Sequence, residues 1–238
     1  MKVVVLGGCG FIGTNVCLEA RKRGHDVVAF DNLVRGLTEE NIPILKEAGV
    51  KIVRGDIRNY VDFDKLPYYP NAIIHLAGQC GIPYAQISPR YDFEVNVLGT
   101  LNVLEYARRR QIPVAFASSS KVYSNITNKI PIKETKTRYE WQYLNSFWDS
   151  KQKIYFYEGK EDKPSLDENL PLDAFGKYAR SLYGTSKVAG DLYCQEYYQA
   201  FGVPTVINRM SCIYGYYQKG VEDQAWVDWF IRQLMFGD

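Results

Sequence analysis

Two side chains in the second half of the sequence have the types and the spacing that acid–base chemistry requires. Tyr183 and Lys187 are four residues apart, which on a helix places them on one face, one turn from each other. A free tyrosine has a pKa near 10, too high for a base at neutral pH, but nearby positive charge lowers that pKa by about 1–3. Lys187 can supply such a charge, and Tyr183 can then accept a proton. The same spacing also occurs in helix-surface pairs that do no chemistry.

A run of three serines offers hydroxyl groups for the same chemistry. Ser118, Ser119 and Ser120 follow an apolar run that begins at Val114. Hydroxyls at a strand end can donate to a substrate oxygen, or they can serve as the caps and turn residues that a strand end needs. The residues alone leave both interpretations open.

A glycine cluster opens the chain directly after the apolar residues Val3 to Leu6. A pyrophosphate is bound by backbone N–H groups and a helix N-terminus, and any Cβ in so tight a turn would block its approach. Gly7 can make the turn, Gly10 can let the backbone approach the phosphates, and Gly13 can let helix and strand pack closely. A closely packed turn without a ligand would also favour small residues, so the cluster predicts a dinucleotide site only in context.

Asp31 supplies part of that context. It ends the second apolar run, eighteen residues after Gly13, at about the offset where dinucleotide-binding folds place a carboxylate on the adenosine ribose. Such a carboxylate repels a 2′-phosphate, which favours NAD over NADP, although Arg35 nearby tempers that choice. The alternative is an aspartate that caps the following loop.

The elements that must position these residues alternate between apolar runs and helical patterns. We therefore predict an α/β fold, a doubly wound parallel Rossmann sheet with helices on both faces, in which ligands bind at the carboxyl edge of the strands. Strands are predicted at 3–6, 26–30, 51–54, 72–78, 114–123 and 204–210, and helices at 14–23, 91–110, 183–201 and 224–236. His75 lies within the fourth strand, where a buried structural role is favoured over catalysis.

The alternation stops between residues 124 and 180, a long, polar and aromatic-rich stretch. A connection of this length is usually functional, and we expect an irregular insertion near the substrate site. An oligomer contact or an insertion with its own small hairpin is the alternative. The whole chain, 1–238, is otherwise predicted to be one NAD-binding domain.

Composition excludes several classes of protein. A formal net charge of +2 gives no reason to expect nucleic acid or a membrane surface. The five cysteines are scattered and never spaced as a Cys-x-x-Cys pair, so we expect free thiols in a reducing cytoplasm and no metal site. The N-terminal apolar run breaks at Gly7, too early for a signal peptide or a membrane span.

The glycine cluster, Asp31, Ser119 and the Tyr183/Lys187 pair, in this order, resemble the extended short-chain dehydrogenase/reductase superfamily. A narrower resemblance is to the CDP-paratose (CDP-tyvelose) 2-epimerases. It covers the chain apart from the segment around 140–165, and its motifs lie at 31–33, 75–79, 121–123, 134–139, 209–215 and 224–226.

This resemblance implies a tightly bound NAD and a CDP- or UDP-linked sugar that is oxidised to a keto-sugar and receives the hydride back on its opposite face. Tyr183 is then the base, Ser119 the donor to the substrate oxygen, and Lys187 the cation that also binds the nicotinamide ribose. The implied cofactor-binding residues also include Gly7, Gly10, Phe11, Ile12, Gly13, Asp31, Asn32, Arg35, Asp56, Ile57, Leu76, Ala77, Gly78, Gln79, Asn96 and Ser118.

Two departures from the family bear on the substrate. The resemblance implies that relatives continue into most of a nucleotide-sugar domain, which we expect to be absent from residues 1–238, and that the loop after Glu140 is longer here than in the relatives. Ser120 and Lys121 stand where the related dehydratases have an acidic pair, which disfavours dehydration. A UDP-glucose 4-epimerase-type enzyme and a non-catalytic NAD-binding domain or fragment remain the alternatives. The resemblance also implies a homodimer, because many relatives form a four-helix dimer interface from the helices that correspond to 91–110 and 183–201.

Overall fold

The computed structural model describes residues 1–67, 69–125, 127, 132–141, 147–149, 154–156, 172, 179–222 and 224–237. The chain divides into two compact units, one made of residues 1–120 and 181–238 and the other of residues 121–180. Among the described residues, no helix is long and apolar enough to cross a membrane.

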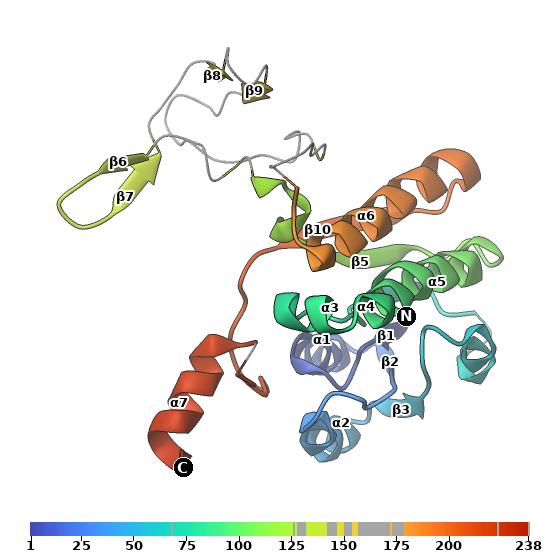
Figure 1. The fold of residues 1–238 in the computed structure, drawn as a ribbon. Coiled ribbons are helices and arrows are strands. Elements are labelled where there is room, and N and C mark those ends of the chain that lie inside the picture. Colours follow the sequence, from blue (N-terminus) through green and yellow to red (C-terminus); the bar gives the residue numbers. More distant parts are fainter. Residues whose placement is uncertain are drawn as a thin grey trace. The chain divides into compact units, whose positions relative to one another are not determined.

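The first unit is built on a six-stranded sheet in which every pairing is parallel (Figure 1). The strands are β1 (Lys2–Leu6), β2 (Asp26–Asp31), β3 (Lys51–Arg54), β4 (Ala72–His75), β5 (Val114–Ser119) and β10 (Thr205–Met210). Their spatial order is β10-β5-β4-β1-β2-β3, so the direction of winding reverses between β1 and β4. This confirms the predicted doubly wound fold and marks the crevice where such sheets bind ligands.

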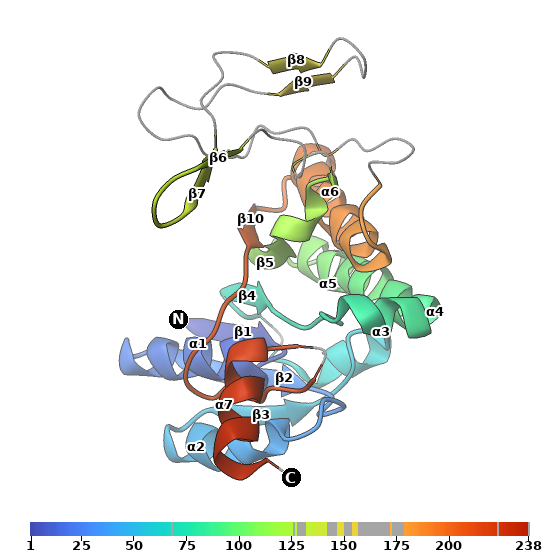
Figure 2. The same cartoon turned by 60° about the vertical axis from the view of Figure 1, so that its left-hand side comes forward.

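Alternation along the strands produces a core on each face of the sheet. Val4 and Leu6 of β1 belong to a cluster packed with side chains of α5 and α6, whereas Val3 and Val5 belong to a cluster that includes Cys17 of α1. Helices therefore cover both faces (Figure 2). The helices of this unit are α1 (Phe11–Lys22), α2 (Ile42–Glu47), α3 (Ile82–Ile87), α4 (Pro89–Phe93), α5 (Gly99–Arg108), α6 (Leu182–Phe201) and α7 (Trp226–Phe236).

Several predicted boundaries were wrong in ways that matter for the site. Helix α1 begins at Phe11 rather than at residue 14, directly after Gly10, which puts Phe11 and Ile12 in its first turn. The single helix predicted at 91–110 is α4, a π-helical turn (Glu94–Leu98) and α5 in succession. The spacing of apolar residues does not reveal this π turn, because a π turn is a single turn inside an otherwise α-helical segment.

The second unit contains two short antiparallel ribbons among its described residues. β6 (Ile132–Glu134) pairs with β7 (Tyr139–Trp141), and β8 (Phe147–Asp149) pairs with β9 (Ile154–Phe156). Much of the insertion predicted at 124–180 lies outside the described residues, and its expected role beside the substrate stays a prediction.

His75 is a buried structural residue, as predicted. It ends β4 with 1% of its surface exposed, and its Nε2 lies 3.1 Å from the Thr100 hydroxyl. Because Thr100 donates its own proton to the Asn96 carbonyl, Nε2 carries the imidazole proton and donates to Thr100. Burial lowers the pKa of His75 to about 3.

This burial predicts a specific loss of stability in mild acid. The unfolded chain takes up a proton at His75 below a pKa of about 6.5 and the folded chain does not, so stability falls as the pH drops below that value. Between pH 7 and pH 5 we expect His75 to account for about 2 kcal/mol of lost unfolding free energy. Urea unfolding of the native chain and of His75→Leu at both pH values measures this. An equal loss in the two proteins would contradict it.

Candidate active site

The glycine turn joins β1 to α1 and is closed on all sides but one. Gly7 has φ +76°, and a Cβ there would lie 2.7 Å from the Ala77 backbone nitrogen. A Cβ at Gly13 would collide with the Gly7 carbonyl oxygen, whereas at Gly10 it would meet only that oxygen, at 3.3 Å, among the described residues. The geometric roles assigned to Gly7 and Gly13 thus agree with the structure, and the turn is open beside Gly10.

That open side adjoins the amino end of α1. The helix caps at Gly10 without a side-chain hydrogen bond, so the N–H groups of its first turn, which includes Phe11 and Ile12, have no capping side chain. Unsatisfied N–H groups and the positive end of a helix dipole attract anions. A diphosphate fits this part of the chain.

Asp31 lies against the same turn at the end of β2. Its carboxylate accepts the Cys9 N–H at 3.0 Å and the Leu33 N–H at 2.9 Å. Burial raises the pKa of Asp31 above its usual value, although backbone hydrogen bonds from Leu33 and Cys9 oppose that shift. Backbone N–H groups of Gly10 and Asn32 also donate to this carboxylate, so Asp31 caps its loop with acceptor positions that a ribose hydroxyl would share.

Further along the sheet edge lie the residues that are predicted to contact the adenosine. Asp56 accepts the Asn32 amide at 3.0 Å and the Arg58 guanidinium at 2.8 Å. Ile57, the next residue, is buried. Arg35 donates at 2.5 Å to Gln224, which is 189 positions away in the sequence. This hydrogen bond joins the loop after β2 to the segment just before α7.

The loop after β4 is held by Asn96, which lies in the π-helical turn. The Asn96 amide donates to the Gln79 carbonyl at 2.9 Å, and its oxygen accepts the Gln79 N–H at 3.0 Å. The Leu76 N–H donates to the Leu6 carbonyl at 2.9 Å, and Ala77 lies against Gly7. A Cβ at Gly78 would be 3.9 Å from the Lys187 ammonium, so this loop reaches the catalytic candidates.

Ser119, Tyr183 and Lys187 come together at the carboxyl end of β5. The first turn of α6 carries Tyr183, and Ser181 caps this helix by accepting the Gly184 N–H at 3.0 Å. The Ser119 side chain hydrogen-bonds to the Tyr183 hydroxyl. Lys187 is 6% exposed and donates to the Ala117 carbonyl. The structure thus brings the Ser119 hydroxyl to the Tyr183 phenol and holds the Lys187 ammonium against the same strand, β5.

Burial is the largest influence on the pKa values of Tyr183 and Lys187. It raises the pKa of Tyr183 to about 12, against the hydrogen bond from Ser119, which lowers it. It lowers the pKa of Lys187 to about 8. At pH 7 the phenol is therefore neutral and the ammonium charged. Tyr183 needs further positive charge beside it before it can act as a base near neutral pH.

Ser118 and Ser119 point to different partners, as neighbours on a strand do. The Ser118 hydroxyl donates at 2.7 Å to Asp191, a carboxylate with no exposed surface. Its side chain is therefore engaged inside the protein, and its predicted cofactor contact stays a prediction. Between these two serines, only Ser119 meets Tyr183.

Sequence reasoning missed the buried polar residues behind the site. Asp92 accepts from the Gln79 and Asn96 amides at 3.0 and 3.1 Å, and Asp191 accepts from Ser118 and Arg209. The available signal was their helical spacing, because Asp92 is four residues before Asn96 and Asp191 four after Lys187. Spacing alone does not show whether such a carboxylate faces solvent or the interior.

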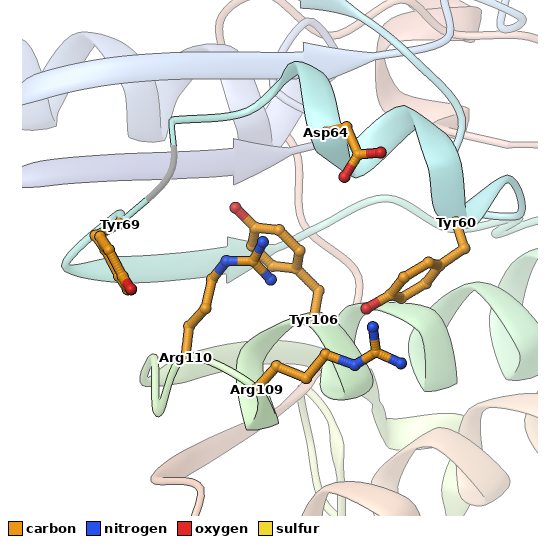
Figure 3. A pocket seen from close by; sticks show the side chains of 6 residues that line it. All are labelled: Tyr60, Asp64, Tyr69, Tyr106, Arg109 and Arg110. Carbon is orange, nitrogen blue, oxygen red and sulfur yellow. The ribbon is translucent and has the colours of Figure 1, made fainter.

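A pocket of about 210 Å³ lies away from these residues (Figure 3). Tyr69 precedes β4, and Arg109 and Arg110 precede β5, so the pocket is at the amino edge of the sheet. The two guanidinium groups lie over the rings of Tyr60 and Tyr106 at 5.2 and 4.2 Å. None of its lining residues is among the predicted site residues.

Comparison with known proteins identifies the family. Residues 3–157 and 154–237 match the NAD dependent epimerase/dehydratase family. The chain belongs to this family. Membership confirms the resemblance that the glycine cluster, Asp31, Ser119 and the Tyr183/Lys187 pair predicted.

Relatives within the epimerase/dehydratase family include CDP-paratose 2-epimerase of Salmonella typhi, 37% identical over 99% of this chain and 64% of that protein. A putative UDP-glucose 4-epimerase of Methanocaldococcus jannaschii is 26% identical over 98% of this chain and 63% of its own length. The solved UDP-glucose 4-epimerase of Thermus thermophilus in complex with NAD has a TM-score of 0.72, is 27% identical, and is covered over 63% of its length. The chain thus spans less than two thirds of these relatives.

Proposed function

We propose that residues 1–238 are the NAD-binding, hydride-transferring domain of a nucleotide-sugar epimerase that acts on CDP- or UDP-linked sugars, most like CDP-paratose 2-epimerase. The observation that carries this is the cluster of Ser119, Tyr183 and Lys187 at the sheet edge that also holds the glycine turn. Family membership and the 37% identity to that epimerase support it.

The residues at the sheet edge fit NAD. The open side of Gly10 and the uncapped first turn of α1 suit the diphosphate, and the Asp31 carboxylate at the end of β2 suits the adenosine ribose. Residues 32, 35, 56 and 57 would surround the adenosine end, and 76–79, 96, 118, 183 and 187 the nicotinamide end. When bound, NAD supplies a reversible acceptor for the hydride of a sugar carbinol.

The chain's own groups would handle the proton and the substrate oxygen. Ser119 donates a hydrogen bond to that oxygen and holds it beside Tyr183. Tyr183 removes the hydroxyl proton on oxidation and returns it on reduction. Lys187 keeps a positive charge close to the sheet end, which favours the phenolate. The same three side chains serve both half-reactions, so epimerisation needs no second acid.

The first experiment tests cofactor and reaction together. The purified chain is denatured, the released nucleotide is identified by mass spectrometry, and UDP-glucose, UDP-galactose and CDP-paratose are incubated with the native chain in deuterated water. We expect bound NAD and an epimer without deuterium at the inverted carbon, because the hydride returns to the carbon it left. Deuterium at that carbon would overturn the mechanism.

A second candidate is an NAD-binding domain without turnover. Thermal-shift measurements with the same nucleotide sugars separate the two. Bound NAD without a shift for any nucleotide sugar supports the second candidate. A shift accompanied by epimer formation supports the first, and the identity of the inverted carbon then separates a 2-epimerase from a 4-epimerase.

We further infer a homodimer and a cytoplasmic location. Apolar side chains of α6 are exposed, among them Leu192 at 46% and Phe201 at 45%, as a helix-to-helix contact between two copies would need. All five cysteines are free, with Cys80 and Cys212 exposed, as a reducing compartment permits. Light scattering of the eluted protein measures the oligomeric state.

A further inference from the structure

A buried carboxylate on α6 joins three elements behind the candidate site. Asp191 has no exposed surface and receives four hydrogen bonds. Its Oδ2 accepts from the Ser118 hydroxyl at 2.7 Å and the Arg209 Nε at 3.0 Å. Its Oδ1 accepts from the Arg209 Nη2 at 3.1 Å and the Gln195 amide at 2.8 Å. We call these four residues the Asp191 cluster.

Stability alone does not explain a buried ion pair of this kind. Removing two charges from water costs free energy that their attraction seldom exceeds, and apolar residues of similar volume often serve as well. Burial raises the pKa of Asp191, but hydrogen bonds from Arg209 and Ser118 outweigh it and hold that pKa below its usual range. The carboxylate is therefore ionised at neutral pH, and its role lies in geometry.

The Asp191 cluster is aligned with the reactive side chains. Tyr183, Lys187 and Asp191 follow one another at intervals of four, so they lie on one face of α6 over two turns. Ser118 immediately precedes Ser119 on β5, and the register of β5 with β10 sets Arg209 opposite Ser118. Asp191 thus holds both strands at the residue adjacent to the Ser119 hydroxyl.

Apolar packing brings α6 close to β5 but does not fix its register. A Cβ at Gly190 would lie 2.9 Å from the Phe116 ring, so helix and strand are already in close contact there. Hydrophobic contact is non-directional, whereas a two-point guanidinium–carboxylate pair constrains both distance and angle. The Asp191 cluster supplies directional bonds at this contact.

We propose that Asp191 is a positioning residue: it fixes the α6 face that carries Tyr183 and Lys187 so that the Tyr183 hydroxyl meets Ser119. The inference rests on the proposed function for its kinetic consequence and on the structure for its geometric one. Loss of the carboxylate lets α6 shift or rotate relative to β5. The oxygen atoms of Ser119 and Tyr183 then separate while the cofactor-binding turn stays intact.

Asp191→Asn tests this, with Glu105→Gln as the matched control. Glu105 also accepts from an arginine, Arg108 at 2.8 Å, and from α6, through the Tyr197 hydroxyl at 2.7 Å. We expect Asp191→Asn to lower kcat at least tenfold with KM and NAD content within twofold of native, and Glu105→Gln to leave kcat within twofold. Equal effects of the two variants on kcat would overturn the proposal.

A double-mutant cycle separates positioning from lost stability. In a Ser119→Ala background the contact that Asp191 positions is already gone, so Asp191→Asn should lower kcat less than threefold further. A full tenfold loss in that background would contradict the proposal. If Asp191→Asn does not fold, Ser118→Ala removes one of the four bonds, and we expect it to lower kcat about threefold in the native background and not in Ser119→Ala.

A measurement that needs no enzyme turnover separates the positioning role of Asp191 from the proposed epimerase function. The coupling between Ser119→Ala and Tyr183→Phe in urea unfolding should vanish in the Asp191→Asn background and persist in the Glu105→Gln background. Undiminished coupling in Asp191→Asn would overturn the positioning role even if epimerisation is observed. Lost coupling in a chain that epimerises no nucleotide sugar would support positioning and refute the proposed function.

Discussion

Replacing Tyr183 with phenylalanine is expected to lower kcat for epimerisation about 10²–10⁴-fold, the range that a positioned general acid–base residue contributes. The substitution removes one oxygen atom and leaves the ring on α6, so the fold and the NAD content should remain those of the native chain. The loss follows from the position of the phenol, hydrogen-bonded to Ser119 and on one helical face with Lys187. Initial rates with each nucleotide sugar, together with NAD released on denaturation, measure it.

Tyr198→Phe is the matched control for this substitution. Tyr198 lies on the same helix with 54% of its surface exposed, and its loss of a hydroxyl should change kcat less than twofold. A Tyr183→Phe protein that retains more than a tenth of the native kcat would remove Tyr183 from the mechanism. The surviving hydrogen-bond donor near the substrate oxygen would then be Ser119.

Gly7→Ala is expected to destabilise the fold strongly, and its effect can be compared with that of a control substitution with equal backbone strain. At φ +76° an alanine costs about 1–2 kcal/mol, and its Cβ would lie 2.7–2.9 Å from backbone atoms of Ala77 and Leu76. Backbone of a buried loop cannot move as a side-chain tip does, so overpacking adds about 1–3 kcal/mol. We expect the unfolding free energy to fall by about 2–5 kcal/mol and NAD to be lost.

Gly24→Ala isolates the steric part of that effect. Gly24 has nearly the same φ, +79°, but no atom of the described residues lies within 4 Å of a Cβ built there. It should cost about 1–2 kcal/mol and leave the NAD content unchanged. Equal losses of stability in the two variants would show that the close approach of the β4 loop to Gly7 contributes nothing.

Local spacing predicted those parts of the site that one element positions. The Tyr183/Lys187 pair needs only the periodicity of a helix, and the glycine turn needs only a strand followed by a helix. Asp31 was found because a fixed offset from the turn carries it to the end of β2. The doubly wound parallel sheet follows from the alternation of strands and helices and from the handedness of crossovers.

Long-range polar contacts could not be predicted in the same way. Asp191 meets Ser118 across 73 positions, and Arg35 meets Gln224 across 189. Nothing local distinguishes a buried carboxylate with four donors from a charged residue on a solvated helix face. The start of helix α1 was predicted three residues too late, because Phe11 and Ile12 lie between glycines and fit a turn as well as a first helical turn.

The three proposed catalytic side chains all belong to the unit formed by residues 1–120 and 181–238, although residues 121–180 separate Ser119 from Tyr183 along the chain. The entropy of closing a loop rises only with the logarithm of its length, by about 0.6 kcal/mol for each doubling. Evolution can therefore lengthen, shorten or exchange this intervening segment at small thermodynamic cost to the sheet. Under the proposed function, relatives of this chain can differ in this segment and still inherit Ser119, Tyr183 and Lys187 unchanged.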